Sequence, residues 1–252
     1  MILEVQEIGR RYGGVVAVND VSFTAKEGSI TALIGPNGAG KTTTLSIISG
    51  MTPPSSGRTL LEGADITGLR ADQICRRGMA RTFQTPQTFS SMSVLENVVV
   101  GTTPLGRISL LGVGLRLPHI AQQEQKLREE AQTWLDLVGV RGLSHEPLGK
   151  LSFGTLRLVE LARALASHPK IILMDEPASG LSRAETQNLR QVLLRIRDRG
   201  TSILLVEHNM PLVMSTADHV YVLDKGKLLA GGTPGEVQTN PLVQKAYLGT
   251  AG

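Results

Sequence analysis

The sequence has almost no cysteine and few aromatic residues. Cys75 is the single cysteine among 252 residues, which excludes an internal disulfide and any metal site built from several cysteines. A reducing compartment is therefore expected, with Cys75 as an inert or simply packed side chain. Aromatic residues make up 3% of the chain, which argues against the base-stacking surfaces that single-stranded nucleic-acid binders need.

Long apolar runs are also missing, and no secretory leader is expected. The best candidate for a membrane span, Ile108 to Leu117, is short and contains Arg116, whereas a membrane helix needs about twenty apolar residues. The segment Met1 to Glu4 shows no basic region followed by an apolar one. A soluble protein of the cytoplasm is expected.

The composition is that of an ordinary globular chain. Apolar residues make up 41% and charged residues 19% of a length that suffices for a sizeable core. The net charge of +4 and the isoelectric point of about 9.4 permit nucleotides, nucleic acid or an anionic membrane face as partners. Charge alone selects none of them.

Strand and helix patterns alternate along the chain. Two blocks of mixed strands and helices flank a more helical stretch from about Pro86 to Lys150, and this alternation indicates a mostly parallel sheet covered by helices. In the helical stretch, Ser93 and Glu96 form a capping-box pattern, and Thr103 to Pro118 is expected to be irregular. The predicted strands cover residues 3–8, 15–23, 30–34, 58–61, 171–174 and 202–206, with a final hairpin at 220–230; the main predicted helices cover 41–49, 121–138, 152–168, 184–199 and 210–217.

A glycine-rich loop follows the apolar run Ile30 to Ile34 and precedes a helix. Its pattern of a glycine, four residues and Gly-Lys-Thr is that of a phosphate-binding loop, in which glycines let backbone N–H groups point at phosphate oxygens. The lysine reaches the β- and γ-phosphates and the threonine hydroxyl ligates Mg²⁺. A chance match is the alternative, and the strand, loop and helix context argues against it. The residues are Gly35, Pro36, Asn37, Gly38, Ala39, Gly40, Lys41, Thr42 and Thr43.

Two acids stand at the end of the apolar run Ile171 to Met174. Asp175 and Glu176 would lie at the carboxyl end of a buried strand, where α/β sheets bind their ligands. Asp175 is expected to hold Mg²⁺ through water, as in P-loop NTPases, and Glu176 to polarise the attacking water. A simple turn is the alternative, and the phosphate-binding loop elsewhere in the chain favours the catalytic interpretation.

Further motifs, in order along the chain, resemble those of ABC-type ATPases. Leu151 to Arg157 resembles their signature, Gln84 the glutamine of their Q-loop, and His208 their switch histidine. Tyr12 resembles the aromatic residue that stacks on adenine, and Ser179 to Ser182 resembles the D-loop. The ordered set is more specific than any one motif, because it extends over nearly the whole chain.

The resemblance implies a fold and its subdivision. It implies an α/β fold with a P-loop NTPase (RecA-like) core, an N-terminal antiparallel β subdomain and an inserted helical subdomain. Residues 1–252 would form a single ABC ATPase domain, with the α/β core at approximately 1–85 and 165–252. The helical insert, at approximately 86–164, would carry the signature.

The resemblance also implies the chemistry. ATP and Mg²⁺ would be bound, with ATP sandwiched between two ATPase subunits packed head to tail, a homodimer or a heterodimer. Ser152 and Gly154 would face the partner's γ-phosphate at a helix N-terminus. Gln84 would touch Mg²⁺ and the attacking water, and His208 would hydrogen-bond the γ-phosphate and steady Glu176.

The signature departs from the family pattern at two positions. Phe153 replaces the first glycine of the Leu-Ser-Gly-Gly-Gln pattern, and Thr155 replaces the glutamine. Thr155 is shorter than glutamine and reaches less far. The contact offered to the partner's nucleotide is expected to be affected, whereas the chain's own phosphate site is not.

Within the family, the chain looks like the ATP-binding subunit of a branched-chain or hydrophobic amino-acid importer, the LivG type. Segments that carry this resemblance include Arg81 to Gln84, Met92 to Val98, Glu207 to Met210 and Lys245 to Gly249. It implies transmembrane permease subunits as partners, a periplasmic or extracellular substrate-binding protein acting indirectly, and a peripheral place on the inner face of the cell membrane.

Two other functions stay open at this point. The first is an ABC-type ATPase that acts on nucleic acid or ribosomes, which the basic isoelectric point permits; no nucleic-acid partner is expected, because such proteins usually add arms, zinc modules or a second cassette. The second is a small-molecule P-loop kinase, in which Ser152 to Arg157 and His208 would have no role.

Overall fold

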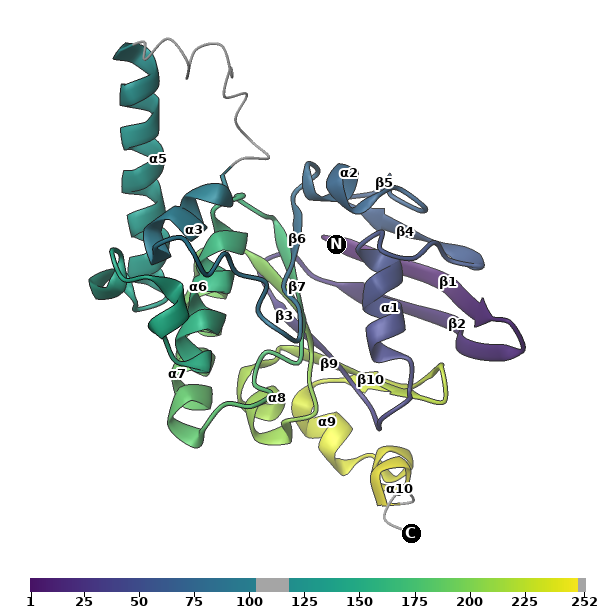
Figure 1. Ribbon diagram of the computed structural model, residues 1–252. Coiled ribbons are helices and arrows are strands. Elements are labelled where there is room, and N and C mark those ends of the chain that lie inside the picture. The colour runs from purple at the N-terminus through teal and green to yellow at the C-terminus, as the bar shows by residue number, and fades with distance from the viewer. Residues whose placement is uncertain (103–117, 249–252) are drawn as a thin grey trace.

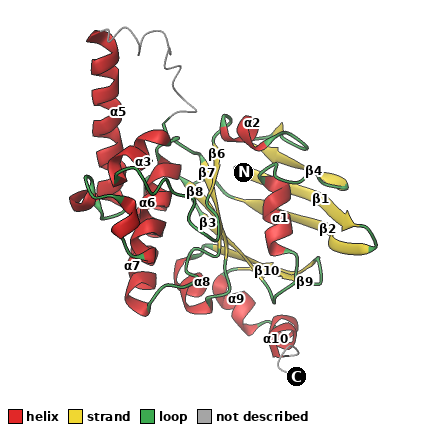
Figure 2. Cartoon of the chain, in the orientation of Figure 1, coloured by secondary structure: helices red, strands yellow, loops and turns green. Residues whose placement is uncertain are grey.

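Two β-sheets organise the chain (Figures 1 and 2). The structure is a computed structural model and describes residues 1–102 and 118–248. The first sheet is antiparallel and has the strand order β2-β1-β4-β5. Its strands are β1 (Leu3–Tyr12), β2 (Val15–Ala25), β4 (Ser56–Leu61) and β5 (Ala64–Asp65). This sheet is the antiparallel subdomain that the sequence predicts.

The second sheet has the strand order β10-β9-β3-β8-β7-β6. All its neighbouring strands run parallel except the pair β9 and β10. Its strands are β3 (Ile30–Ile34), β6 (Met79–Arg81), β7 (Ile171–Asp175), β8 (Ser202–Val206), β9 (His219–Asp224) and β10 (Lys227–Gly232). The predicted mostly parallel sheet and C-terminal hairpin are thus confirmed.

Side chains of the central strands alternate between two cores. Ile172 and Met174 of β7 pack with the helices on one face, whereas Ile171 and Leu173 pack with the antiparallel sheet and α1 on the other. The strands β3, β7 and β8 are buried along their whole length, which explains their continuous apolar runs. The helices that the sequence predicts, by their range or by a capping box, are α1 (Lys41–Ile48), α3 (Val94–Val100), α5 (Pro118–Leu137), α6 (Phe153–Leu165), α7 (Arg183–Asp198) and α8 (Met210–Thr216).

Several short elements escaped prediction from the sequence. These are β6, α2 (Ala71–Cys75), the 3₁₀ turns Arg141–Leu143 and Leu148–Lys150, and the C-terminal helices α9 (Pro234–Thr239) and α10 (Pro241–Leu248). None is long enough to show a clear hydrophobic period. The expected irregular segment 103–118 lies, apart from Pro118, outside the described residues.

Helix starts follow the predicted caps. The Ser93 hydroxyl accepts the backbone N–H of Glu96, whose side chain binds back to Ser93, so the predicted capping box is present. Ser152 caps α6 in the same position by accepting the N–H of Thr155. This cap fixes the start of the helix that carries the signature.

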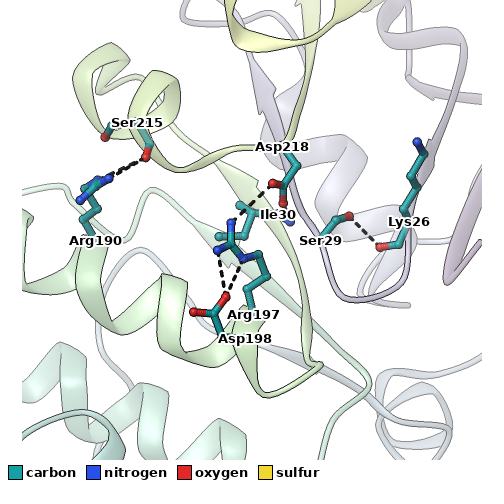
Figure 3. A network of polar contacts seen from close by, with 8 residues as sticks. All are labelled: Lys26, Ser29, Ile30, Arg190, Arg197, Asp198, Ser215 and Asp218. Atoms are coloured by element: carbon teal, nitrogen blue, oxygen red, sulfur yellow. Dashed lines mark hydrogen bonds and ion pairs between the residues drawn. The ribbon is translucent and has the colours of Figure 1, made fainter.

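A polar network ties α7 to the start of β3, at the strand end away from the phosphate-binding loop (Figure 3). Asp218 accepts the backbone N–H of Ile30 at 2.8 Å and pairs with Arg197 at 3.5 Å. Arg190 donates to the carbonyl of Ser215, which joins α7 to α8. These bonds hold α7 and α8 against the sheet at one end of its strands, and the site lies at the other end.

None of the helices in residues 1–102 and 118–248 combines the length and the apolar character needed to cross a membrane.

Candidate functional site

The phosphate-binding loop joins β3 to α1, as predicted. Gly40 caps α1 in the left-handed region, with φ 97°, and a Cβ there would lie 2.6 Å from the carbonyl oxygen of Ala17. At Gly35 a Cβ would lie 2.1 Å from the carbonyl oxygen of Leu223. Only glycine fits these two positions, so the loop curls tightly at the carboxyl end of β3.

Lys41 lies folded onto this loop. Its side chain is buried, with 6% of the residue exposed, and Nζ donates to the carbonyl oxygens of Gly35 at 2.8 Å and Pro36 at 3.0 Å. Burial lowers the pKa of the Lys41 ammonium, and the charges of Glu176 and Asp175 act in the opposite direction. The cation therefore faces both the loop and the acidic end of β7.

A cavity of about 320 Å³ opens beside the loop. Loop residues and Glu176 line it together with Ala17 of β2, which sequence reasoning did not select; the lining residues are Ala17, Asn37, Gly38, Ala39, Gly40, Lys41, Thr42, Thr43 and Glu176. Gly35 and Pro36 contribute their carbonyl groups to Lys41 instead. A polar cavity at a glycine-rich loop, beside a lysine and the start of a helix, suits a polyphosphate.

Three predicted catalytic residues meet at Glu176. The Gln84 amide donates to Glu176 Oε2 at 3.2 Å, and His208 Nδ1 lies 3.6 Å from the same oxygen. Glu176 has φ 47°, a backbone conformation that is uncommon outside glycine and is often found at functional sites. Gln84 and His208, which lie 92 and 32 residues from Glu176 in the sequence, thus converge on its carboxylate at the cavity.

Asp175 is held by an arginine that sequence reasoning did not select as functional. Arg81 Nη2 lies 3.2 Å from Asp175 Oδ2, with both side chains largely buried, and Arg81 also donates to Ser49 and Ser46 of the α1 region. Burial raises the pKa of the Asp175 carboxyl, and Arg81 opposes the shift. Arg81 therefore ties β6 to β7 and α1 directly behind the predicted metal ligand.

Arg81→Met is expected to lower the free energy of unfolding by about 3 kcal/mol at neutral pH, because it leaves Asp175 buried without its cation. The penalty should shrink as pH falls through the raised pKa of Asp175, since the protonated carboxyl needs no counter-ion. Urea unfolding at several pH values measures both effects. The control Arg70→Met breaks an exposed pair with Asp72 and should change little. An equal loss in both variants would contradict this account.

The residues present fit a magnesium ion. Thr42 lies in the first turn of α1 and Asp175 ends β7 at the same edge of the sheet, and their hydroxyl and carboxylate oxygens are ligand types that Mg²⁺ prefers. Gln84 uses its amide nitrogen toward Glu176, so its oxygen is the atom that would reach the metal. When bound, Mg²⁺ would neutralise phosphate charge in the transition state.

The signature lies at the N-terminus of α6. Ser152 Oγ is 3.0 Å from Thr155 Oγ1, and a Cβ on Gly154 would collide with Glu185 of α7 at 2.3 Å. The exposed ring of Phe153 lies beside Gly180 of the D-loop, where a Cβ would be 3.3 Å from it. Ser152 and Gly154 do not line the chain's own phosphate cavity, as expected for residues that would serve a partner.

Tyr12 ends β1 and is exposed, with the guanidinium of Arg10 4.7 Å from its ring centre. It does not line the phosphate cavity described above. Its predicted stacking on adenine stays a prediction.

Charged residues on one face of α6 hold the Q-loop by its backbone. Arg157 donates to the carbonyls of Phe83, at 2.6 Å, and Gln84, while Glu160 accepts the N–H groups of Phe83 and Gln87. Arg157 and Glu160 are buried, although such residues are rarely buried without partners. Their spacing of three on a helix whose other residues are mostly apolar is a signal visible in the sequence that the prediction did not use. The helix of the signature thus sets the position of Gln84.

Comparison with known proteins agrees with this geometry. Residues 18–179 match the family described as ABC transporter, and residues 227–252 match the family described as branched-chain amino acid ATP-binding cassette transporter. The structure superposes on a solved ATP-binding cassette of an ABC transporter in its ADP conformation with a TM-score of 0.86 and 33% identity, covering 98% of both chains.

Curated relatives match over nearly the full length. The high-affinity branched-chain amino acid transport ATP-binding protein BraF of Pseudomonas aeruginosa is 38% identical over 99% of this chain and 98% of its own length. LivG of Salmonella typhimurium is 39% identical over the same shares, and LivG of Escherichia coli K12 is 38% identical.

On its two-sheet α/β core, the chain carries a phosphate-binding loop, two acids at a strand end, and a glutamine and a histidine that converge on one of these acids. This combination defines an ATP-binding cassette. The chain belongs to the ABC transporter family. It is an ATPase of that family, with the P-loop NTPase fold predicted from its sequence.

Proposed function

We propose that this chain is the ATP-hydrolysing subunit of a membrane importer for branched-chain or other hydrophobic amino acids. The observation that carries the catalytic part is the meeting of Gln84 and His208 at Glu176, beside the phosphate cavity. The names of the relatives BraF and LivG support amino-acid import. The same names favour transport over the alternative of an ATPase that acts on nucleic acid.

The residues divide the reaction between them. Lys41 and the loop N–H groups hold the phosphates, and Thr42, Asp175 and Gln84 would hold Mg²⁺. Glu176 takes a proton from the water that attacks the γ-phosphorus, the bond to the bridging oxygen breaks, and ADP and phosphate leave. His208 orients Glu176 and the γ-phosphate.

A second ATPase subunit completes the site. The phosphate cavity is lined by the loop, Ala17 and Glu176, whereas the signature residues Ser152 and Gly154 lie at the start of α6. In a head-to-tail pair, the N-terminus of the partner's α6 directs its positive dipole end at the γ-phosphate. Tyr12 stacks on the adenine.

The partners beyond the ATPase pair follow from the transport role. Transmembrane permease subunits carry the amino acid, an external or periplasmic binding protein delivers it, and this chain sits on the inner face of the membrane. The permease and the binding protein set which amino acid is transported.

The permease docks in a groove between the α/β core and the helical insert. The groove has a volume of about 540 Å³ and is lined on one side by Met51, Ala71 and Ile74 and on the other by Val100 and Arg163. Phe83 and Gln87 of the Q-loop also line it. A short amphipathic helix of the permease fits this apolar groove. Because Phe83 and Gln87 line the groove on either side of Gln84 in the sequence, a shift of the docked helix moves Gln84.

Met51→Asp tests the docking site. Met51 is 55% exposed at the groove, and a carboxylate buried there against the apolar face of the docked helix should weaken binding by at least about tenfold. After co-expression with the permease, the Asp variant should lose co-purification while the ATPase rate of the isolated subunit is kept. Leu242→Asp, on the equally exposed Leu242 of α10, is the matched control and should co-purify. Retention of the Met51 variant, or loss of both, would contradict the proposal.

A further inference from the structure

A buried carboxylate that the proposed mechanism does not use lies between two catalytic loops. Glu207 directly follows β8 and is 0% exposed. Its Oε1 accepts the backbone N–H of Ala178 at 2.7 Å, and its Oε2 accepts the N–H groups of His208 at 3.0 Å and Asn209 at 3.1 Å. A buried carboxylate persists in a protein only where such donors satisfy it.

The donors come from two segments that carry catalytic residues. Ala178 lies between Glu176 and the D-loop residues Ser179 to Ser182, whereas His208 and Asn209 begin the turn that leads into α8. These turns follow the neighbouring parallel strands β7 and β8, where Asp175 pairs with Val206. Glu207 therefore bridges the segment of Glu176 to the segment of His208.

The charge of Glu207 also has a cationic neighbour. Burial lowers the pKa of the Arg157 guanidinium, whereas the carboxylates of Glu160 and Glu207 raise it. Arg157 itself holds the Q-loop carbonyls. The three segments that carry Gln84, Glu176 and His208 thus surround one group of buried charged residues. These residues are Arg157, Glu160 and Glu207.

We propose that Glu207 is a positioning residue that fixes the His208 segment against the Glu176 and D-loop segment. Its carboxylate sets the distance between the two turns and so places the imidazole of His208 at Glu176. When the D-loop moves, Ala178 moves with it, and the hydrogen bonds that Glu207 accepts from Ala178 and His208 shift His208 as well. This inference rests on the catalytic roles of Glu176 and His208 in the proposed function.

A double-mutant cycle with His208 separates positioning from general structural damage. Glu207→Gln keeps the shape but offers one acceptor fewer, so it should lower kcat by about tenfold to about a hundredfold through misplacement of His208. The KM for ATP should stay within about twofold, because the phosphate loop is unchanged. In a His208→Ala background the same change should alter kcat by less than about twofold.

Glu160→Gln is the matched control. Glu160 is also buried and also accepts two backbone N–H groups, but from the Q-loop. Its effect on kcat should multiply with that of His208→Ala, because it does not act through the histidine. If Glu207→Gln yields no folded protein, Glu207→Asp keeps the charge, draws it back by one methylene and is run through the same cycle.

The outcomes are distinguishable. Effects of Glu207→Gln and His208→Ala that multiply would overturn the positioning role and leave the proposed function intact. A His208→Ala variant with unchanged kcat would instead overturn the proposed role of His208. Faster amide hydrogen exchange in residues 177–182 and 207–212 of the Glu207 variant is also expected, and unchanged exchange in both segments would overturn the inference.

Discussion

Glu176→Gln is expected to lower the kcat of ATP hydrolysis by about a hundredfold to about ten-thousandfold, while ATP affinity stays within about threefold. Glutamine has the same shape as glutamate but cannot accept a proton from the attacking water. The contacts that Glu176 makes with Gln84 and His208 are polar and close, at 3.2 and 3.6 Å, and an amide can keep part of them. Phosphate release and equilibrium nucleotide binding measure the two quantities.

Glu236→Gln is the control for this substitution. Glu236 caps α9 by accepting from Thr233, so its replacement should leave kcat unchanged. Near-native hydrolysis in the Glu176 variant would show that another group activates the water, and the assignment of the site would be wrong.

Lys41→Ala is expected to weaken ATP binding by at least about a hundredfold, because it removes the charged donor that the loop presents to the phosphates. The substitution also removes the bonds from Nζ to Gly35 and Pro36, so the loop loses part of its fixed shape. Titration with a fluorescent ATP analogue in the presence of Mg²⁺ measures the affinity.

Lys26→Ala provides the comparison for Lys41. Lys26 is exposed and lies on the turn before β3, so its loss should leave the affinity within about twofold. An equal effect of both substitutions would mean that the general positive charge of the chain, rather than Lys41, attracts the nucleotide.

The sequence was sufficient to predict those parts of the site whose residues are consecutive in the chain. The phosphate loop and the acids after β7 each occupy a few consecutive residues, and their glycine spacing or buried strand has a direct physical meaning. Gln84 and His208 were found only through the ordered resemblance to ABC-type ATPases. A single glutamine or histidine has no local pattern that predicts its convergence on Glu176.

The supporting residues escaped because their partners are distant backbone groups. Glu207 binds the N–H of Ala178, 29 residues away, and Arg157 binds the carbonyl of Phe83, 74 residues away. Backbone groups carry no sequence signal, so such bonds become visible only in the folded chain. Arg81 is similar, since its role depends on β6, a strand of three residues that pairs with β7.

The structure shows what the two altered residues of the signature contact. Phe153 lies against the D-loop and the guanidinium of Arg157 is 5.1 Å from its ring centre. Thr155 binds Ser152 within the first turn of α6. The side chains that depart from the family pattern therefore support the signature from within the chain, and Ser152 keeps its place at the helix start.

The most direct test of the account is the mass of the Glu176→Gln variant in solution with saturating ATP and Mg²⁺, measured by light scattering. For a homodimer, the account predicts a nucleotide-dependent pair with twice the 26.9 kDa mass of one chain, and no pair when Lys41→Ala is added; for a heterodimer, the pair forms only with the co-expressed second ATPase subunit. A variant that binds ATP yet forms no pair, either alone or with a co-expressed second ATPase subunit, would contradict the head-to-tail site.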